Sequence, residues 1–408
     1  MSSAEAAKAA DYDVAIVGAG PSGATAADDL ARRGYRVLLI DGSTRIKPCG
    51  GAIPPRLVRD FAIPDQLLKA RIKSARIIAP SGRHVDMPIS GGYVGMVDRD
   101  EFDEWLRERA VANGATRVRA SFREFTRDTD GVARLRLVRL DDQAAKEVRA
   151  RVIIGADGAA SPLARQAMPD SAPPPLVYAY HEILQSPPSD GASYDSERCD
   201  VYYQGGLSPD FYGWVFPHGE KLSVGTGTAR KGFSIRAGTT ALRAVAGLDT
   251  VATVRTEGAP IPMRPRKRWD NGRDVVLAGD AAGVVAPASG EGIYYAMIGG
   301  QHAALAAHEC LASGNARALA GARKRFMREH GRVFWVLGIM QRFWYSSDAR
   351  RERFVSMCAD PDVQRLTWEA YMNKRLVRAR PMAHVRIFFK DLAHLLGLGP
   401  ARSPDRSS

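Results

Sequence analysis

The segment from residue 13 to residue 41 limits the fold of this chain more than any other, because it predicts a strand, a glycine-rich loop, a helix and a second strand in succession. Residues 14–17 form a short β-branched apolar run, which is typical of a buried strand. The run leads into Gly18-Ala19-Gly20-Pro21-Ser22-Gly23, a G-x-G-x-x-G loop. We predict a helix over residues 24–33 and a strand over residues 36–40 after it. This order is typical of a dinucleotide-binding βαβ unit.

The residue types in this segment each have a physical task in binding a dinucleotide. Gly18 permits the tight turn, Gly20 lets a pyrophosphate approach the backbone, and Gly23 lets the helix pack closely on the strand. The helix N-terminus offers unpaired N–H groups and a partial positive charge to the phosphates. Asp41, at the end of the second strand, can accept hydrogen bonds from an adenosine ribose. A plain glycine-rich turn is the alternative for the loop taken alone.

The composition is that of a globular protein with an excess of positive charge. The chain has 408 residues, of which 45% are hydrophobic and 25% charged, and its formal net charge is +13. An anionic membrane surface or a diphosphate ligand would suit that charge. Nucleic acid is not expected as a partner, because no helix-turn-helix, zinc-finger or RNA-binding signature occurs. The four cysteines are far apart, so we predict neither a metal site nor a disulfide framework.

The remaining sequence predicts further strands and helices in a definite order. Asp98 and Glu101 have the spacing of a capping box that opens a helix. Prolines at 173–175 mark a boundary, after which short runs predict a largely antiparallel sheet up to residue 254. Residues 274–278 predict another buried strand, and a long alanine-rich helix follows it.

Two more glycine-containing motifs follow predicted strands. They are Gly155-Ala156-Asp157-Gly158 and Gly279-Asp280, and with the N-terminal loop their order resembles the FAD-binding flavoproteins of the aromatic-hydroxylase superfamily. The resemblance implies that Asp280 meets the ribityl chain of FAD and that Asp157 lies near the dinucleotide. The alternative is that both are polar turn residues at strand ends.

Three further segments narrow the resemblance. They are PCGGAIP at residues 48–54, PDFYGWVFP at 209–217 and SGEGI at 289–293. They resemble the geranylgeranyl reductases, and among these the branch that reduces the isoprenoid tail of chlorophyll and bacteriochlorophyll. The similarity extends from about residue 12 to residue 396, and its Y-x-W-x-F-P element is specific to the family.

This resemblance implies an FAD-dependent enzyme that saturates three of the four double bonds of a geranylgeranyl chain, with NADPH as electron donor. It leaves open whether the substrate is the free diphosphate or the pigment-bound chain, whether the pigment is chlorophyll or bacteriochlorophyll, and whether ferredoxin replaces NADPH. Arg99 and Phe122 fall where the family lines the FAD. The residues that we assign to FAD binding are Gly18, Gly20, Pro21, Ser22, Gly23, Asp41, Cys49, Gly50, Arg99, Phe122, Asp157, Gly279, Asp280, Gly290, Gly292 and Ile293.

The expected architecture is α/β. We predict a Rossmann-type FAD-binding domain of the aromatic-hydroxylase type, an inserted, mainly antiparallel substrate domain and a helical C-terminal region. The FAD-binding domain is expected to be discontinuous, over residues 11–75, 98–172 and 258–315. The β-rich substrate domain would comprise residues 76–97 and 173–257, and the helical region residues 316–408.

Saturating an isolated alkene requires an apolar slot beside the flavin and a proton source, because no carbonyl group delocalises the developing charge. Tyr212, Trp214 and Phe216 alternate along a predicted strand and would line the slot from one face. A packing face in the core of the second domain is the alternative for these three. For the proton we name Cys49 and Tyr212 as catalytic candidates, with His218 as another, and an inert buried thiol is the alternative for Cys49.

The helix that opens at residues 290–293 would serve the reduced cofactor. Its positive end could face the N1–C2=O edge of the flavin and stabilise the anionic reduced form. Two glycines in this segment would let the backbone come close.

The C-terminal part carries two apolar stretches with basic residues around them, at 333–345 and 385–396. Basic, apolar helices can lie in an anionic membrane interface, although they can equally cover the core of a substrate domain. Residues 1–11 lack the apolar core of a signal peptide, and no apolar run reaches the roughly 18 residues of a spanning helix. We therefore expect a cytoplasmic protein that attaches peripherally to the photosynthetic membrane.

Two other functions are compatible with a dinucleotide fold. An FAD monooxygenase would insert oxygen instead of saturating alkenes, and turnover without oxygen would exclude it. A non-catalytic prenyl-binding escort would be favoured if the purified protein were colourless and could not be reconstituted with FAD.

Overall fold

The computed structural model describes residues 10–42, 44–190 and 194–374, and its first sheet is built on the predicted βαβ unit. Five parallel strands lie in the order β16, β10, β1, β2 and β8, and β9 runs antiparallel between the extended ends of β8 and β10. The strands are β1 (Tyr12–Val17), β2 (Val37–Asp41), β8 (Thr116–Arg127), β9 (Ala133–Arg139), β10 (Ala145–Gly155) and β16 (Val275–Leu277). Apolar runs buried on both faces are expected of such parallel strands.

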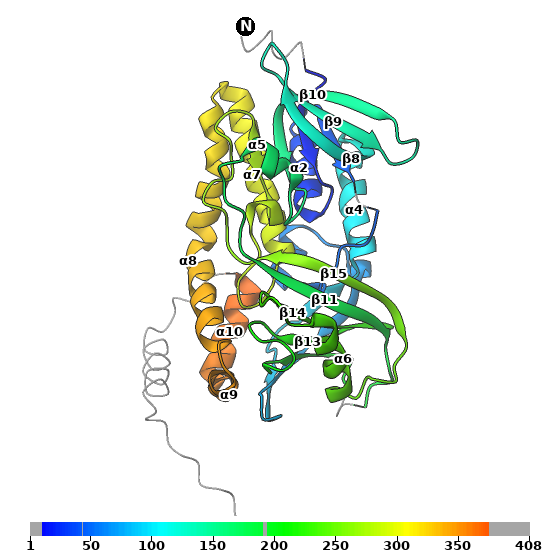
Figure 1. Cartoon of the computed structure of the whole chain (residues 1–408), viewed down its shortest axis with the longest axis vertical. Helices are drawn as coiled ribbons and strands as arrows, with labels where there is room; N and C mark the ends of the chain where they lie inside the picture. The colour runs from blue at the N-terminus through cyan, green and yellow to red at the C-terminus, as the bar shows by residue number, and fades with distance from the viewer. Residues whose placement is uncertain (1–9, 43, 191–193, 375–408) are drawn as a thin grey trace, which may run out of the picture.

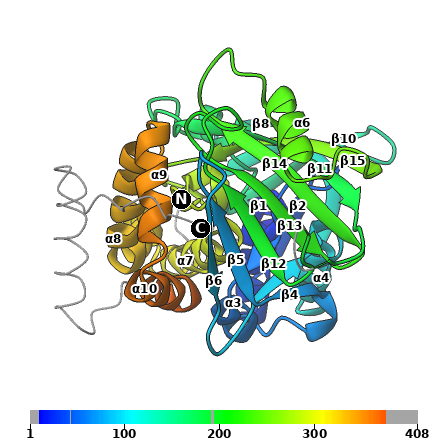
Figure 2. The ribbon, with the colours of Figure 1, turned by 90° about the horizontal axis from the view of Figure 1, so that it is seen from below.

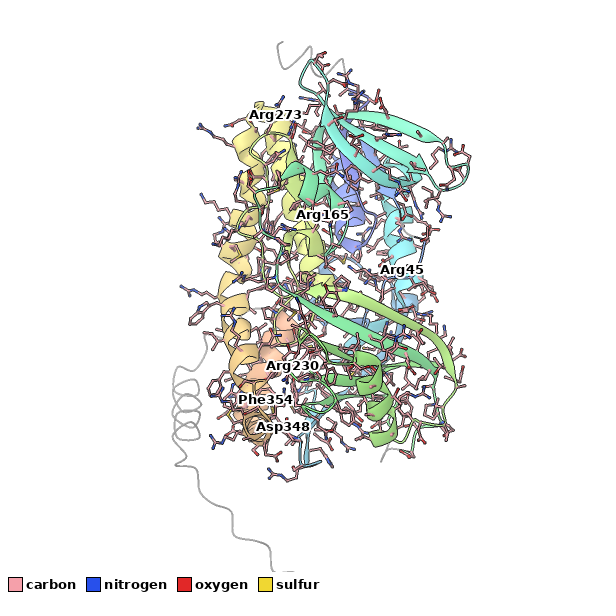
Figure 3. All side chains as sticks on the ribbon, viewed as in Figure 1. Arg45, Arg165, Arg230, Arg273, Asp348 and Phe354 are labelled. Carbon is pink, nitrogen blue, oxygen red and sulfur yellow. The ribbon has the colours of Figure 1, made fainter. Side chains whose placement is uncertain are left out.

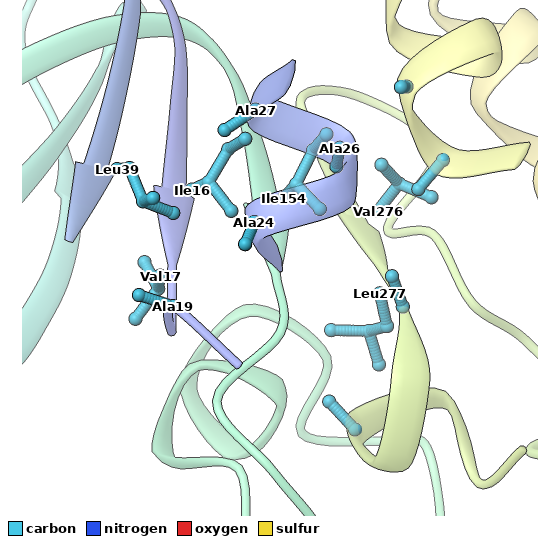
Figure 4. Close-up of a cluster of buried hydrophobic side chains, with 14 of the residues drawn as sticks. Ile16, Val17, Ala19, Ala24, Ala26, Ala27, Leu39, Ile154, Val276 and Leu277 are labelled. Atoms are coloured by element: carbon cyan, nitrogen blue, oxygen red, sulfur yellow. The ribbon is translucent and has the colours of Figure 1, made fainter. Parts of the chain in front are cut away.

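Helices cover this sheet in the upper half of the molecule (Figure 1). They are α2 (Pro21–Arg32), α4 (Arg99–Ala112), α5 (Pro162–Ala167) and α7 (Ile293–Ser313). Small residues let α2 approach the sheet closely, and Figure 4 shows Ala24 and Ala27 facing Ile16 and Ile154 in one buried cluster. Helix α7 packs equally tightly on α2, because a Cβ at Gly300 would lie 2.3 Å from the carbonyl oxygen of Ser22.

A second sheet of seven strands occupies the lower half of the molecule (Figures 1 and 2). Its order is β15, β11, β14, β13, β12, β5 and β6, and only β5 and β12 pair in parallel. The strands are β5 (Ser74–Ile78), β6 (His84–Pro88), β11 (Leu176–Gln185), β12 (Arg198–Tyr202), β13 (Gly213–His218), β14 (Lys221–Thr228) and β15 (Thr253–Pro262). Helix α6 (Ile235–Val245) packs against β14.

Smaller elements join the two halves. A third, three-stranded sheet consists of β3 (Ala52–Ile53), β7 (Val94–Val97) and β4 (Leu68–Ile72), with α3 (Pro55–Asp60) beside it. Short 3-10 turns are η1 (Asp65–Leu67), η2 (Gly279–Ala282) and η3 (Ala316–Ala320). Residues 76–97, which we assigned to the substrate domain, are therefore divided between two sheets. Strands β5 and β6 belong to the second sheet, whereas β7 pairs with β3 and β4 in the third.

The C-terminal part that the structure describes is helical, as predicted. Helix α8 (Gly321–Trp344) runs along one side of both halves, and α9 (Asp348–Met357) and α10 (Pro361–Asn373) lie beside the second sheet (Figures 1 and 2). The predicted apolar stretch 385–396 lies outside the described residues. The predicted α/β class with an antiparallel second sheet and a helical end is confirmed. The division into domains stays a prediction.

One local prediction was wrong. Asp98 is the N-cap residue of α4, but its side chain makes no capping hydrogen bond. The carboxylate lies 3.3 Å from His218 Nδ1 and 3.8 Å from Lys221 Nζ instead, and Glu101 pairs with Lys69 at 2.7 Å. The carboxylates of Asp98 and Glu101 therefore pair with basic side chains of neighbouring strands instead of accepting hydrogen bonds from the N–H groups at the start of α4.

Candidate active site

The glycines of the G-x-G-x-x-G loop are of two kinds. Gly18 and Gly23 are packed against backbone atoms, whereas Gly20 borders open space. Gly18 has φ +105°, and a Cβ there would lie 2.3 Å from the carbonyl oxygen of Ala156. A Cβ at Gly23 would lie 1.9 Å from the carbonyl oxygen of Gly18. At Gly20, in contrast, a Cβ would meet no atom within 4 Å. The backbone at Gly20 is therefore open to a ligand, as a pyrophosphate cradle requires.

The start of α2 offers hydrogen-bonding groups beside this open space. Pro21 occupies the first turn, so the helix begins directly after Gly20. The hydroxyl of Ser22 is buried and has no hydrogen-bond partner among the described residues. An orphaned hydroxyl at a helix N-terminus fits a phosphate group, whose oxygen would accept a hydrogen bond from it.

A cleft of about 1010 Å³ that includes Asp41 is lined by six basic and five acidic residues. Asp41 is buried and accepts a hydrogen bond of 2.7 Å from Arg117, which also binds Glu104. Hydrogen bonds from Arg117 lower the pKa of Glu104 to about 2, so this carboxyl stays charged. The cleft also includes Arg45, which Figure 3 shows near the level where the two halves of the molecule meet. The arginines of this mixed lining are the groups that a diphosphate would contact.

A second, more apolar cavity of about 280 Å³ lies where the two halves of the molecule meet. Tyr212, Trp214 and Phe216 all line it, and successive ring centroids are 6.1 and 6.3 Å apart. The alternation along β13 therefore places the three aromatic rings on one wall, as predicted. The other walls come from the loop 49–52, strands β11 and β15, and the start of α7.

Trp214 is held by a polar network inside the second sheet. Its indole N–H donates to Ser223 Oγ at 3.0 Å, and Ser223 lies 2.8 Å from His181 Nδ1. His181 Nε2 lies 2.9 Å from Glu257 Oε2. These contacts fix the plane of the indole against the cavity, which His181 also lines.

Arg99 connects the cleft and the cavity, because it lines both. Its guanidinium is buried and makes hydrogen bonds of 2.8 and 2.7 Å to Asp103, one turn along α4. Burial opposes the charge on Arg99, but Asp103 and Cys49 beside it keep its pKa above the usual range. A permanently charged group thus stands between the two spaces.

Lys47 and Asp280 form an ion pair at the cavity wall. Lys47 Nζ lies 2.7 Å from Asp280 Oδ2, and both residues line the cavity. Asp280 follows Gly279, whose φ is +59° and which would bring a Cβ to 2.8 Å from Ser22 Cβ. The predicted Gly279-Asp280 turn therefore lies directly against the start of α2.

The glycines at the start of α7 also line the cavity. Gly290 has φ +65°, and a Cβ there would lie 3.0 Å from the ring of Phe211. Gly292 is the N-cap of α7 and Ile293 its first residue. The sequence analysis assigned Gly290, Gly292 and Ile293 to FAD binding, and all three line this cavity.

Seven of the residues assigned to FAD line neither the cleft nor the cavity: Gly18, Gly20, Ser22, Gly23, Phe122, Asp157 and Gly279. Among these, the side chains of Asp157 and Phe122 have partners elsewhere. The carboxylate of Asp157 accepts hydrogen bonds from Ser161 Oγ at 2.5 Å and from the N–H of Leu163 at 2.9 Å, at the start of α5. The backbone of Asp157 lies beside the glycine loop, because a Cβ at Gly18 would come within 2.9 Å of Asp157 Cα. Phe122 lies on β8 opposite Leu137 and packs against the hydrophobic core of the first sheet. Both side chains have local partners that the motif order could not reveal.

The three proton-donor candidates differ in their surroundings. Tyr212 donates its hydroxyl hydrogen to the carbonyl oxygen of Ser289 at 2.6 Å, and burial raises its pKa far above the usual range. His218 does not line the cavity, and its Nε2 lies 3.1 Å from the carbonyl oxygen of Gly50. Cys49 lines the cavity and accepts a 3.4 Å hydrogen bond from the N–H of Gly51.

Sequence reasoning missed several residues of this site. Glu291 and Tyr371 line the cavity, and Lys374 forms an ion pair with Glu291. The place of Glu291 between two glycines was a usable signal. Nothing in the sequence linked Tyr371 or Lys374 to a segment so far away.

Comparison with known proteins places this geometry in a family. A family described as an FAD binding domain matches residues 11–173. The geranylgeranyl diphosphate reductase of Rhodobacter capsulatus is 56% identical over 391 residues, which cover 95% of this chain and 98% of that protein. The chain belongs to the geranylgeranyl reductase family. The family and the open cradle at Gly20 agree that the N-terminal unit is an FAD-binding domain.

Solved structures show the same fold. A geranylgeranyl bacteriochlorophyll reductase-like protein from Thermoplasma acidophilum has a TM-score of 0.79 at 21% identity, covering 95% of this chain and 98% of that one. The anhydrotetracycline hydroxylase from Streptomyces rimosus has a TM-score of 0.67 at 19% identity, covering 90% of this chain and 77% of that one. The aromatic-hydroxylase type of fold predicted for this geranylgeranyl reductase family member is thereby confirmed.

Proposed function

We propose that this protein is an FAD-dependent reductase of (bacterio)chlorophyll biosynthesis that saturates three double bonds of a geranylgeranyl chain to give phytyl. The substrate is geranylgeranyl (bacterio)chlorophyll, geranylgeranyl diphosphate or both. The observation that carries the proposal is the 56% identity to a geranylgeranyl diphosphate reductase across nearly the whole of both chains. An apolar, aromatic cavity next to the FAD-binding elements is the space that such a chain needs.

In this proposal the residues of the site divide the work between cofactor and substrate. The Gly20 backbone and the N-terminus of α2 bind the pyrophosphate of FAD, and Asp41 binds the adenosine ribose. Arg99 and Asp280 bind the segment of FAD that connects the pyrophosphate to the flavin ring. Reduced FAD supplies the hydride for the alkene. The aromatic wall orients the flexible chain and excludes water, and the N-terminus of α7 favours negative charge on the reduced cofactor.

NADPH is the proposed electron donor. The sequence holds one dinucleotide fingerprint, so the nicotinamide must reach the flavin without a second dinucleotide-binding domain. This point is tested by mixing the FAD-loaded protein with NADPH under anoxic conditions. Reduction of the bound FAD is measured as the loss of its visible absorbance. Reduction by ferredoxin alone would contradict it.

Mass spectrometry of pigment tails in a strain that lacks this gene tests the function in the cell. We expect geranylgeranyl tails in place of phytyl tails, and restoration of phytyl when the gene is returned. Normal phytyl tails in the deletion strain would contradict the proposal.

The membrane that holds such a substrate is the proposed docking surface for α8. Within the described residues, no helix combines the length and apolar character needed to cross a bilayer. The α8 stripe consists of Arg328, Arg332, Trp335, Ile339 and Arg342, which recur at helical spacing and are all exposed. The side of α8 that carries Phe334 and Trp344 is buried, so only part of the predicted apolar stretch is available. Arg351, beyond the helix, is also buried, against Asp348.

Replacing Trp335 and Ile339 with alanine is expected to weaken binding to anionic vesicles about tenfold or more. These side chains are 69% and 48% exposed, and burying each in the interface is worth roughly 1.5–3 kcal/mol. Flotation with phosphatidylserine vesicles measures the effect, which should shrink at high salt because the arginines contribute.

A matched control for this experiment removes an apolar pair elsewhere. Val245 and Val254 are 58% and 50% exposed, and their alanine variant should float like the wild type. Wild-type protein that stays unbound at low salt would contradict attachment. Equal binding by the α8 variant and the wild type would place the contact elsewhere in the chain.

A further inference from the structure

The cavity holds a carboxylate that neither the fold nor the FAD explains. Its acidic lining residues are Asp280 and Glu291. Asp280 is paired with Lys47. The Glu291 side chain is only 6% exposed, and its Oε1 is buried and has no hydrogen-bond partner among the described residues. A buried charge with an unsatisfied oxygen is costly, so its presence beside an apolar cavity needs a reason.

The other oxygen of Glu291 meets a second buried charge. Lys374, directly after α10, donates a hydrogen bond from Nζ to Glu291 Oε2, and its side chain is 2% exposed. The ammonium lies 3.7 Å from the ring centroid of Tyr371, which lines the cavity. The pair is therefore almost fully buried at the cavity wall.

Burial brings the proton affinities of the two groups together. It raises the pKa of Glu291, although Lys374 opposes this, and it lowers the pKa of Lys374, although Glu291 opposes that. The other titratable groups facing the pair are Tyr294 and Tyr295 on α7, Tyr371 on α10 and Arg56 on α3. Both shifts bring the pKa values of the carboxyl and ammonium groups closer together than they are in water.

The reaction requires a proton, and this inference rests on the proposed function. Tyr212 has committed its hydroxyl hydrogen to Ser289, and His218 lies outside the cavity lining. Cys49 also lines the cavity, where its sulfur accepts a hydrogen bond from the N–H of Gly51 and lies beside the Arg99 guanidinium.

We propose that Glu291 is the proton donor for alkene saturation and that Lys374 returns the proton to it. In each step one carbon of the double bond receives a hydride from the reduced cofactor, which is oxidised by two electrons. The other carbon takes the proton of the Glu291 carboxyl group, leaving a carboxylate. That carboxylate recovers a proton from the Lys374 ammonium, and the amine is protonated again from water before the next double bond is reduced.

Glu291→Gln tests the donor, because an amide keeps the shape of the side chain but cannot release a proton. We expect FAD binding and chemical reduction of the flavin to remain, while the rate of flavin reoxidation by the geranylgeranyl substrate falls about 100- to 10,000-fold. The control is Glu101→Gln, which changes a carboxylate paired with a lysine on the surface and should leave the rate unchanged.

Lys374→Met tests the return of the proton. A first saturation at nearly the wild-type rate, followed by much slower saturation of the next double bonds, is the expected result. If Glu291→Gln reoxidises at the wild-type rate while the wild type saturates the chain, Glu291 is not the donor. If the wild type itself saturates nothing, the proposed function fails and this inference falls with it.

A readout without turnover uses nuclear magnetic resonance of lysine side chains labelled with heavy nitrogen. The Nζ signal of Lys374 is the one absent from Lys374→Met. We expect it to lose its proton well below the usual lysine value of about 10.4, and at a still lower pH in Glu291→Gln, because the carboxylate that favours the ammonium is gone. An Nζ that stays charged up to the usual value would overturn the role of Lys374, even if Glu291→Gln does not fold.

Discussion

Gly20→Val is expected to give a folded protein that no longer retains FAD. A Cβ at this position meets no protein atom within 4 Å, so the side chain adds no clash to the apo fold. It does occupy the space in which a pyrophosphate must approach the backbone. We expect a loss of about 3 kcal/mol or more in FAD binding, roughly 100-fold in Kd.

The measurement for this variant is titration with FAD, followed by flavin fluorescence, together with thermal unfolding of the apoprotein. Gly206→Val is the matched control, because a Cβ at Gly206 would also meet no atom within 4 Å and this glycine lies away from the site. It should bind FAD like the wild type. FAD binding by Gly20→Val with unchanged affinity would mean that the cofactor does not use this loop.

Arg99→Met is expected to cause a large loss of stability. It leaves the buried carboxylate of Asp103 without its bidentate partner, with Arg107 at 3.9 Å as the nearest remaining cation among the residues that the structure describes. Breaking a buried pair in this way costs about 3–5 kcal/mol. The double variant Arg99→Met/Asp103→Leu removes both charges and should recover most of that loss.

The same two variants separate the structural role of Arg99 from its role toward FAD. Because the double variant is stable but lacks the guanidinium between cleft and cavity, we expect its FAD binding to weaken by about 1.5–3 kcal/mol, roughly 10- to 150-fold in Kd. Urea unfolding and FAD titration measure the two effects. A double variant that binds FAD as tightly as the wild type would show that Arg99 serves only Asp103.

The sequence predicted those parts of the site that depend on local patterns. The G-x-G-x-x-G loop imposes its own turn through Gly18 and Gly23, and the alternation of Tyr212, Trp214 and Phe216 follows from the two-residue repeat of a strand. In both cases the chemistry and the backbone geometry come from neighbouring residues. No tertiary contact is needed to infer them.

Local patterns did not predict the partners of side chains that can pair with several groups in the folded protein. Asp157 stands at the expected turn, but Ser161 and the N–H of Leu163 hold its carboxylate at α5. Asp98 has the spacing of a capping residue, but His218 and Lys221 of distant strands compete for it. Glu291 and Lys374 are 83 residues apart, and only the packing of α10 on the cavity brings them together.

The most direct test of the central claim is saturation of the substrate without oxygen. Purified protein loaded with FAD, reduced chemically under argon and mixed with geranylgeranyl bacteriochlorophyll or geranylgeranyl diphosphate, is analysed by mass spectrometry. We expect a product that gains one pair of hydrogen atoms for each flavin oxidised. No change in mass under argon, with an added oxygen atom once air is admitted, would contradict the account and identify a monooxygenase.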